Sequence, residues 1–357
     1  MRLQHLHLPH CAPSLYPPYS LASRVQEHLR RRQLDFKDAS SSSSDSPSSS
    51  TTTTTSRPAA SPPTQPPPGV TATQRLPLRQ PPPPTLLSFT PMPTYTLGRR
   101  QAAPLTEHEA ARLKAPLRII LPGQDDQPSS TPPLSHAAPL PVAVVHSPRG
   151  GQTTYHGPGQ AVLWPVLDLK SPHHKQFTVR CYSRLLEDTT ISVLRSLFGL
   201  AAFITEDPGV WVSPTSPGLL ALNDPAKIAA LGVHLRRHVT ALGTAINIAM
   251  PSADVLSEEI NPWARIVACG LEGKTVTSVA AEVDGGLQSL DSRLGNRIRE
   301  EAVATFWGGE LARRIGVEGV DAAAHDDVVA LVTDILSRSD DATAEEVEYV
   351  KRMQRLF

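Results

Sequence analysis

The sequence predicts an α+β protein in which helices pack on a mixed β-sheet. Short β-branched segments and segments with a helical spacing of apolar residues occur along the same chain, without regular strand–helix alternation and without an internal repeat. Proline accounts for 36 of the 357 residues, and Pro, Ser and Thr are concentrated in blocks. Such blocks have too little apolar surface to offset the entropy lost on ordering, so the remaining sequence suffices for roughly one large domain.

Two interpretations fit the N-terminal segment. Its apolar residues have the spacing of a strand followed by an amphipathic helix: Leu3, Leu6, Leu8, Leu21, Val25 and Leu29. The first 35 residues also contain more arginine than acidic residues, which is typical of a mitochondrial presequence. A folded strand and helix and a cleaved presequence therefore both remain open.

Composition divides the chain into four parts. We expect a first strand and helix in residues 1–38, a Ser/Thr/Pro-rich insert in residues 39–84, the main body of the domain in residues 85–315 and a C-terminal helical extension in residues 316–357. The insert ends in four consecutive prolines and is expected to be flexible or partly polyproline. A proline-recognising partner and a tolerated surface insertion both fit this composition, because lengthening a loop adds little closure entropy.

After the insert, residues 85–89 are expected to form a strand and residues 123–140 a second loop. Further strands are predicted where β-branched residues cluster, at residues 142–146, 161–169, 202–205, 209–212, 227–233 and 244–248. Helices are predicted where apolar residues recur with helical spacing, at residues 179–197, 296–315 and 326–336.

Charge and cysteine content exclude several classes of protein. The chain has 34 basic and 34 acidic residues, which gives no general signature of nucleic-acid or membrane binding. No run of about 18 apolar residues occurs, so no membrane span is expected. The three cysteines, Cys11, Cys181 and Cys269, are an odd number at wide spacings and predict neither a disulfide framework nor a metal site. Free thiols in a reducing compartment are expected.

A glycine-rich segment, Arg149–Gln160, lies between two predicted strands. Its four glycines permit positive φ and close approach to a ligand, and consecutive backbone N–H groups can form an anion-binding nest. Arg149 and His156 add polar side chains. The segment is interpreted as a binding loop, although an ordinary hairpin loop can have the same composition.

Two further segments carry reactive side chains. Lys227 leads into a mostly apolar stretch, where a lysine loses hydration, its pKa falls and it becomes suited to act as a base. A solvated lysine at a strand end is the commoner arrangement. Cys269 follows a β-branched pair and precedes Gly270, as a nucleophile at a strand-to-turn corner would, although a free cysteine more often serves as a small buried hydrophobe.

Together these segments resemble the lipoyl(octanoyl) transferases, the enzymes that move octanoate from an acyl carrier protein to lipoyl domains. The resemblance rests on Arg149–Gln160, Lys227–Gly232 and the Ala268-Cys269-Gly270 corner, which occur in the family's order. The turn Thr94-Tyr95-Thr96-Leu97-Gly98-Arg99 is also similar to the family's turn after its strand. The likeness covers residues 1–38 and 85–315, with the inserts extra.

Three positions depart from the family's pattern. Trp164 replaces a usual tyrosine, Ala268 replaces a frequent proline, and Leu242 stands where many members have a histidine. The change at Trp164 is expected to reshape an apolar wall rather than the chemistry. The change at Leu242 affects the contacts expected of Gly243–Ala245.

The resemblance implies the fold of the biotin/lipoate protein ligase catalytic domain and a set of site residues. It implies that Cys269 is the nucleophile that forms an acyl-thioester, and that Lys227 acts as acid and base and favours the thiolate of a thiol that ordinarily titrates near ~8.5. The residues implied to line the acyl pocket are Arg149, Gly150, Gly151, Gln152, Thr153, Thr154, Tyr155, His156, Ala230, Leu231, Gly232, Gly243, Thr244 and Ala245. Backbone N–H groups near Cys269 and the glycine loop are candidate oxyanion donors. No cofactor and no metal are expected.

The implied donor is octanoyl-acyl carrier protein, and the implied acceptors are the lipoyl domains of 2-oxoacid dehydrogenases and the glycine cleavage H protein. A thioester divides the transfer into two half-reactions, which suits a site that cannot hold both carriers at once. The resemblance points to a fungal mitochondrial member, because eukaryotic acceptors reside in mitochondria. Two alternatives are an ATP-dependent lipoate or biotin-type ligase, which needs no cysteine, and an inactive relative, which needs neither Lys227 nor Cys269.

Overall fold

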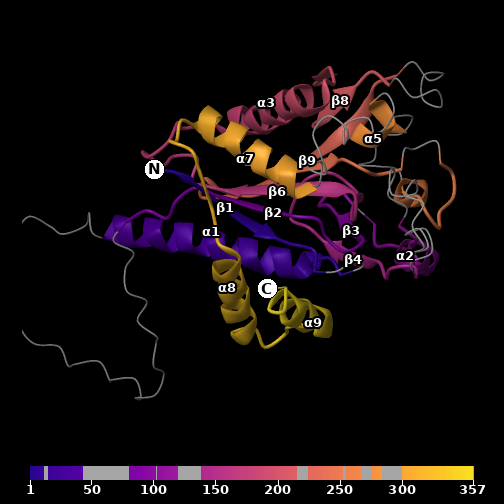
Figure 1. Ribbon diagram of the computed structural model, residues 1–357, viewed down its shortest axis with the longest axis horizontal. Coiled ribbons are helices and arrows are strands. Elements are labelled where there is room, and N and C mark those ends of the chain that lie inside the picture. The colour runs from indigo at the N-terminus through magenta and orange to yellow at the C-terminus, as the bar shows by residue number, and fades with distance from the viewer. Residues whose placement is uncertain are drawn as a thin grey trace, which may run out of the picture.

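The computed structural model describes residues 1–11, 15–42, 80–101, 103–119, 138–214, 224–251, 255–266, 275–283 and 300–356. These residues form the predicted α+β fold, a mixed sheet with helices packed on it (Figure 1). The strand order is β12-β1-β2-β6-β10-β9-β8-β7, and β11 pairs with β9. The strands of this sheet are β1 (Leu3–Leu8), β2 (Thr85–Phe89), β6 (Gln160–Val166), β7 (Ala202–Phe203), β8 (Val210–Val212), β9 (Ala226–Arg236), β10 (Val239–Asn247), β11 (Thr275–Val276) and β12 (Val320–Ala322).

Helices cover both faces of the sheet. On one face lie α3 (Val179–Phe198) and α7 (Glu300–Ile315), and on the other α1 (Tyr19–Ser42), α8 (His325–Ser337) and α9 (Ala344–Met353) (Figure 1). Strand β6 shows why two layers are needed, because all of its residues are buried. Leu163 belongs to the core beneath α3 and α7, whereas Trp164 belongs to the core beneath α1. A strand that is apolar on both faces requires a cover on each.

Helix α3 begins and ends where its sequence supplies caps. The Thr178 side chain accepts a hydrogen bond from the backbone N–H of Cys181, and Gly199 ends the helix with a left-handed φ of 71°. Its buried residues, including Tyr182, Leu186 and Val193, recur at the spacing of one helical face. The same helix therefore presents its polar side chains away from the core.

A smaller sheet lies beside the main one. Strand β3 (Thr94–Leu97) pairs in parallel with β4 (Ala143–His146) and antiparallel with β5 (Thr154–His156). Tyr95, Tyr155 and Trp263 belong to its apolar core. Strand β5 lies inside the glycine-rich segment Arg149–Gln160, so the expectation of one continuous loop there is wrong. The glycines instead flank a short strand. The remaining elements are α2 (Glu107–Lys114), the 3₁₀ turn η2 (Pro262–Arg265) and α5 (Val279–Glu282).

Residues 1–38 are a structural part of this domain. Strand β1 pairs in parallel with both β12 and β2, and α1 packs on the sheet. The interpretation as a folded strand and helix is therefore the one that the structure supports. Helix α1 continues to Ser42, past the expected start of the insert. Gln33 Nε2 donates to the carbonyl oxygens of Pro82 (3.1 Å) and Pro83 (3.2 Å), which ties the chain before β2 to α1.

Strands β9 and β10 form one long antiparallel hairpin, where the sequence predicted two short strands. Arg237 and His238 make the turn with φ values of 50° and 69°, which a two-residue hairpin turn requires. Leu242 also has a positive φ, 62°. Next to it, Gly243 lies opposite Gly232 in the ladder.

The C-terminal part is more than the helical extension expected. Strand β12 extends the main sheet, and the buried residues of α8 and α9 share the α1 core. The predicted helices at residues 179–197 and 326–336 correspond to α3 and α8, and the one at 296–315 corresponds to α7 over its described residues. Most of the predicted loop at residues 123–140 lies outside the described residues. In the part of the chain that the structure describes, no helix is long and apolar enough to span a membrane.

Candidate functional site

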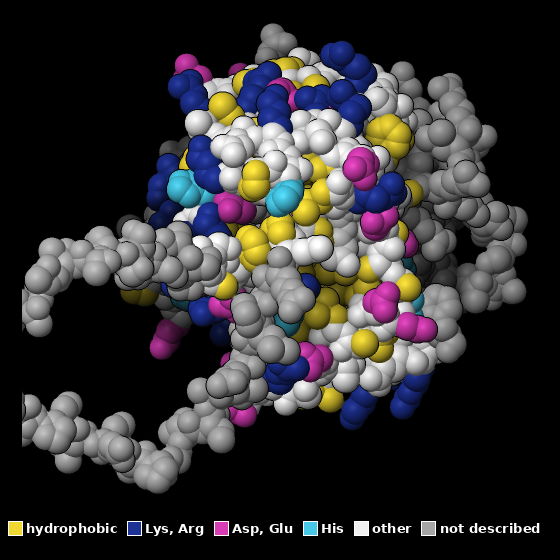
Figure 2. Space-filling model, turned by 90° about the vertical axis from the view of Figure 1, so that its left-hand side faces the viewer, with side chains coloured by type: hydrophobic (Ala, Val, Ile, Leu, Met, Phe, Trp, Pro, Cys, Tyr) yellow, Lys and Arg dark blue, Asp and Glu magenta, His cyan; other side chains and the backbone are white. Residues whose placement is uncertain are grey.

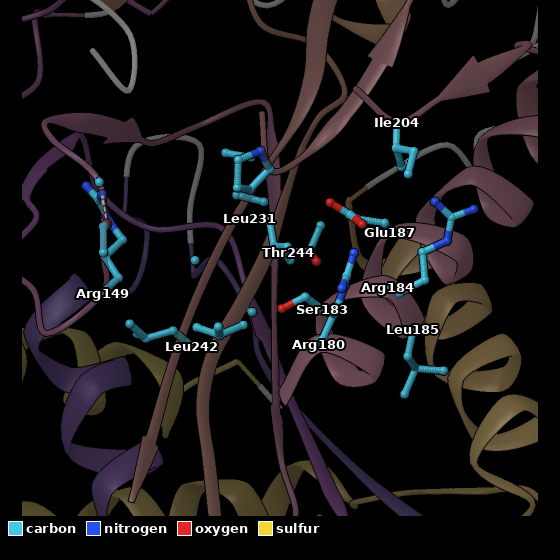
Figure 3. A pocket seen from close by; sticks show the side chains of 18 of the residues that line it. Arg149, Arg180, Ser183, Arg184, Leu185, Glu187, Ile204, Leu231, Leu242 and Thr244 are labelled. Carbon is cyan, nitrogen blue, oxygen red and sulfur yellow. Dashed lines mark hydrogen bonds between the residues drawn. The ribbon is translucent and has the colours of Figure 1, made fainter. Parts of the chain in front are cut away.

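A cavity of about 1440 Å³ opens between α3, the β9–β10 hairpin and the glycine-rich segment (Figure 3). Arg180, Arg184 and Glu187 of α3 lie on one side of the hairpin residues Leu231 and Thr244, and Arg149 lies on the other (Figure 3). Of the residues expected to line a pocket, those at its wall are Arg149, Gly150, Gly151, Thr154, His156, Ala230, Leu231, Gly232, Gly243, Thr244 and Ala245, and Lys227, expected to be catalytic, lies there too. The fold thus brings three distant segments of the sequence to one cavity.

Three of the expected pocket residues lie elsewhere. The carbonyl oxygen of Gln152 accepts from the N–H of Gly98 (3.3 Å), and the Thr153 hydroxyl donates to Gln101 Oε1 (3.2 Å). Tyr155 is fully buried between Tyr95 and Trp263, with ring centroids 5.2 and 5.8 Å apart. None of the three lines the cavity. For Tyr155 the reason is its place in β5, where alternate residues point to opposite faces.

Several glycines are needed because the cavity wall is tight. A Cβ on Gly243 would lie 2.2 Å from the carbonyl oxygen of Leu163, and one on Gly98 would lie 2.3 Å from that of Gly151. A Cβ on Gly232 would lie 2.9 Å from Arg149 Cδ. These absent side chains let β10 approach β6 and let the glycine loop pack on β3 and β9.

Arg149 holds the glycine loop in place. Its Nη2 donates to the carbonyl oxygen (2.6 Å) and hydroxyl (2.7 Å) of Thr96, and its Nη1 donates to the carbonyl oxygen of Gly150 (3.0 Å). Its aliphatic part lies against Gly232. The guanidinium therefore connects the loop to β3, while the stem forms part of the cavity wall.

His156 begins a chain of buried hydrogen bonds. Its Nδ1 lies 2.8 Å from Gln160 Oε1, Gln160 Nε2 donates to Asn247 Oδ1 (2.9 Å), and Asn247 Nδ2 donates to the carbonyl oxygen of Thr277 (2.9 Å). Burial lowers the pKa of His156 to about 4, so the ring is neutral at physiological pH. Because the amide of Gln160 points its oxygen at the ring, the network assigns the proton to Nδ1 and leaves Nε2 as an acceptor.

Lys227 is buried in the cavity wall, with 5% of its surface exposed. Its Nζ donates to the carbonyl oxygen of Pro208 (3.0 Å) and lies 4.7 Å from the centroid of the Trp211 ring. A backbone carbonyl and an indole face are the kinds of partner that compensate a desolvated ammonium. The alternative of a solvated lysine at a strand end does not apply here.

Cys269 lies outside the described residues, as does Ala268. The chain on its C-terminal side returns to the site, because β11 begins at Thr275 and pairs Val276 with Lys227. The N–H of Thr277 also donates to the carbonyl oxygen of Lys227 (3.0 Å). The other two cysteines are free thiols: Cys11 is partly buried, which raises its pKa to about 11, and Cys181 is exposed at the cavity wall.

Sequence reasoning missed the contribution of α3 and of the turn before β8. Glu187 lies on the predicted helix, but its helical position alone does not distinguish it from other polar residues. The turn Thr205-Glu206-Asp207-Pro208-Gly209 has the composition of a tight turn between two predicted strands, which was the available signal. Nothing in that composition indicates that the Pro208 carbonyl holds a lysine.

Positive charge predominates around the cavity. Its basic residues are Arg99, Arg100, Arg149, Lys175, Arg180, Arg184, Lys227, Arg313 and Arg314, whereas its acidic residues are Glu187, Asp188, Glu206 and Asp207. Figure 2 shows Lys and Arg side chains gathered at the top of the face, the side on which α3 and α7 lie. Within the described ranges, no group of three or more His, Cys, Asp or Glu side chains could hold a metal ion.

Comparison with known proteins gives a consistent result. The model of the lipoyl protein ligase A/B catalytic domain matches residues 72–305. The probable octanoyltransferase of Schizosaccharomyces pombe is 34% identical over 224 residues, which cover 62% of this chain and 78% of that protein. The mitochondrial octanoyltransferase of Saccharomyces cerevisiae is 28% identical over 256 residues, covering 69% of this chain and 65% of that protein. The octanoyltransferase of Rickettsia africae is 39% identical over 140 residues, covering 39% and 59%.

Proposed function

The chain belongs to the lipoyl(octanoyl) transferase family and is an octanoyltransferase, and we propose that it carries the octanoyl group on Cys269 as a thioester before a lysine of a lipoyl domain receives it. The donor is octanoyl-acyl carrier protein. The observation that carries this proposal is Lys227, a buried ammonium in the wall of a large cavity, on a strand whose neighbour β11 follows the Cys269 segment. The cationic surroundings of the cavity favour an anionic donor.

In the first half-reaction the Cys269 thiolate attacks the thioester carbonyl of the donor. The bond to the carrier sulfur breaks, and the departing carrier thiolate takes a proton from Lys227. In the second half-reaction the neutral amine of the acceptor lysine attacks the Cys269 thioester, an amide forms and the Cys269 thiolate leaves. The proton lost by the amine returns to Lys227, so the enzyme ends as it began.

The cavity can hold the acyl group between the two half-reactions. Its wall combines the apolar side chains of Trp164, Leu231 and Leu242 with the backbone of the glycine loop. An alkyl chain gains free energy from such surfaces at about 25 cal/mol per Å² removed from water. The acyl group can therefore stay bound while one carrier leaves and the next arrives. We place the reaction in mitochondria, as the name of the Saccharomyces cerevisiae relative suggests.

The test is the mass of the intact protein after mixing with octanoyl-acyl carrier protein in the absence of an acceptor. We expect one added octanoyl group, mapped by peptide analysis to Cys269. Cys269→Ser should remove the label and slow transfer by at least about 100-fold, because an alcohol is a far poorer nucleophile near neutral pH. Cys11→Ser and Cys181→Ser are matched controls and should keep the label.

A label on Cys11 or Cys181, or full transfer by Cys269→Ser, would contradict the thioester route. Formation of an adenylate from ATP and lipoate, without any need for carrier, would instead support the ligase alternative. A protein that binds octanoyl carrier but forms neither species would be an inactive relative.

A further inference from the structure

One peptide group connects Lys227 to a carboxylate that the steps above do not use. The carbonyl oxygen of Pro208 accepts from Lys227 Nζ at 3.0 Å, and the N–H of Gly209, in the same peptide group, donates to Glu187 Oε1 at 3.2 Å. Hydrogen bonds at the two ends of a peptide group polarise one another. A carboxylate on the N–H therefore strengthens the carbonyl as an acceptor for the ammonium.

The backbone on either side of this peptide group is already fixed. Gly209 has a φ of 125°, and a Cβ there would lie 2.6 Å from the carbonyl oxygen of Ala229, so the turn packs directly on β9. Trp211 Nε1 donates to the carbonyl oxygen of Asp207 (3.1 Å). Glu187, on α3, supplies the remaining contact to this peptide group, and it also lies at the cavity wall.

The surroundings of Glu187 suit this role. The side chain is half-buried, and burial raises the pKa of its carboxyl, whereas the Gly209 N–H, Arg184 and Lys227 act in the opposite direction. The charged groups around it are Arg184 and Asp188 on α3, Lys227 on β9, and Glu206 and Asp207 on the turn. Asp188 pairs with Arg184 on the same helix (2.9 Å), whereas Glu187 contacts the turn.

We propose that Glu187 is a positioning residue that holds Lys227 in place through the Pro208–Gly209 peptide group. This inference rests on the proposed function, in which Lys227 exchanges protons with the reacting thiols and amine. Between these fixed points, the hydrogen bond from Gly209 to Glu187 sets the orientation of the peptide plane. Without the carboxylate the plane loses this restraint, and the ammonium loses its alignment. Proton transfer is then slower, while the surfaces that bind the donor stay intact.

Three substitutions separate this role from a purely structural one. Glu187→Ala removes the acceptor, Glu187→Asp keeps the charge but shortens the reach by one methylene, and Glu187→Gln keeps an acceptor oxygen at the same position. Single-turnover acylation by octanoyl-acyl carrier protein gives a rate constant and a half-saturating donor concentration. The ¹³Cε resonance of Lys227, assigned by its disappearance in Lys227→Arg, reports on the ammonium itself. Glu348→Ala, on the exposed face of α9, is the control.

We expect Glu187→Ala and Glu187→Asp to lower the rate constant by about tenfold or more, with the half-saturating donor concentration changed by less than about twofold. The Lys227 resonance and its titration should shift in both. Glu187→Gln should retain most of the rate, and Glu348→Ala all of it. Glu187→Asp and Glu187→Gln keep the test valid if the alanine variant does not fold.

The inference would be overturned by an unshifted Lys227 resonance in Glu187→Asp. It would also be overturned if the Glu187 variants lost only affinity for the donor and kept the acylation rate constant. A loss in Glu187→Gln as large as in Glu187→Asp would reject the route through the peptide group. Failure of the proposed function looks different, because wild-type protein would then form no thioester on Cys269. If wild type is acylated and Lys227→Ala is slow but Glu187→Asp is not, only this inference fails.

Discussion

At the scale of single residues, Lys227 combines deep burial with specific compensation. A desolvated ammonium is costly, but the Pro208 carbonyl and the Trp211 ring face supply electrostatic partners. Its aliphatic part lies close to Gly209: a Cβ added to Gly209 would be 3.4 Å from the Cε of Lys227. The side chain therefore has one well-defined position in the cavity wall. A group that must exchange protons with several partners in turn benefits from such fixation.

The first prediction at this scale concerns the pH dependence of acylation. In the proposed mechanism, Lys227→Ala removes the cation that favours the Cys269 thiolate, so single-turnover acylation should fall by about 100-fold at neutral pH and recover in part as pH rises. Lys227→Arg keeps the charge but cannot exchange a proton, because a guanidinium stays protonated. It should preserve part of the thiolate and still slow transfer. The measurement is the acylation rate constant against pH for the three proteins, and identical profiles would remove Lys227 from the mechanism.

At the scale of elements, the pairing of β1 with β2 encloses a polar cluster. His5 Nε2 and His7 Nδ1 each lie 2.8 Å from the hydroxyl of Ser88. Burial lowers the pKa of both histidines to about 4, and the proximity of His7 adds to the effect on His5. Both rings are neutral at physiological pH, and the shared hydroxyl satisfies them inside the sheet.

This cluster predicts an acid-sensitive sheet. The histidines titrate near 6.5 when unfolded and near 4 when folded, so between these values the unfolded state binds more protons and stability falls as pH falls. From pH 6.5 to 4 the pair should cost about 5 kcal/mol of unfolding free energy, since each histidine contributes about half of it. Urea unfolding across this range measures the slope, and the double variant His5→Gln/His7→Gln should flatten it. The control is His108→Gln, on exposed α2, and a slope unchanged in the double variant would contradict the assignment.

Elements were predictable to the extent that they carry a periodic pattern. The helical spacing of apolar residues predicts α3 and α8, and the β-branched cluster at residues 142–146 predicts β4. Strands β5 and β12 have three residues each, too few for a period to appear. The β9–β10 hairpin was missed because its turn contains Arg237 and His238, without the Asn-Gly or Gly pattern that usually marks such turns.

At the scale of the whole molecule, the Ser/Thr/Pro-rich insert joins two parts of one sheet. Helix α1 runs to Ser42 before it, and the chain is again tied to α1 by Gln33 at Pro82 and Pro83. The boundaries that composition suggested, residues 39 and 84, therefore include residues that belong to the fold.

Replacing residues 43–79 with a short Gly/Ser linker should preserve both fold and activity. Its midpoint of thermal unfolding should change by less than about 1 °C, since a change of 1 kcal/mol shifts the midpoint by about 2–4 °C for a domain of this size. Replacing residues 39–84 should be worse by about 1 kcal/mol or more, because it also removes the hydrogen bonds from Gln33. Differential scanning calorimetry and single-turnover acylation test both deletion variants. Loss of acylation in the shorter deletion, with the fold kept, would assign a function to the insert.

The sequence by itself determined the fold class, the family and two segments that meet at the cavity, the glycine-rich segment and the stretch that begins at Lys227. These depend on local composition and on motifs whose order survives in the chain: the glycine-rich segment, Lys227 and Cys269. Only the tertiary structure decided which side chains of those segments line the cavity. Strand pairing directs the Tyr155 side chain into the core of the smaller sheet, while His156 remains at the cavity wall. It also decided the partners of Lys227, which are the carbonyl oxygen of Pro208, the ring of Trp211 and, through the Pro208–Gly209 peptide group, Glu187. A backbone carbonyl leaves no trace in residue identity, so contacts of this kind become visible only when the chain is folded.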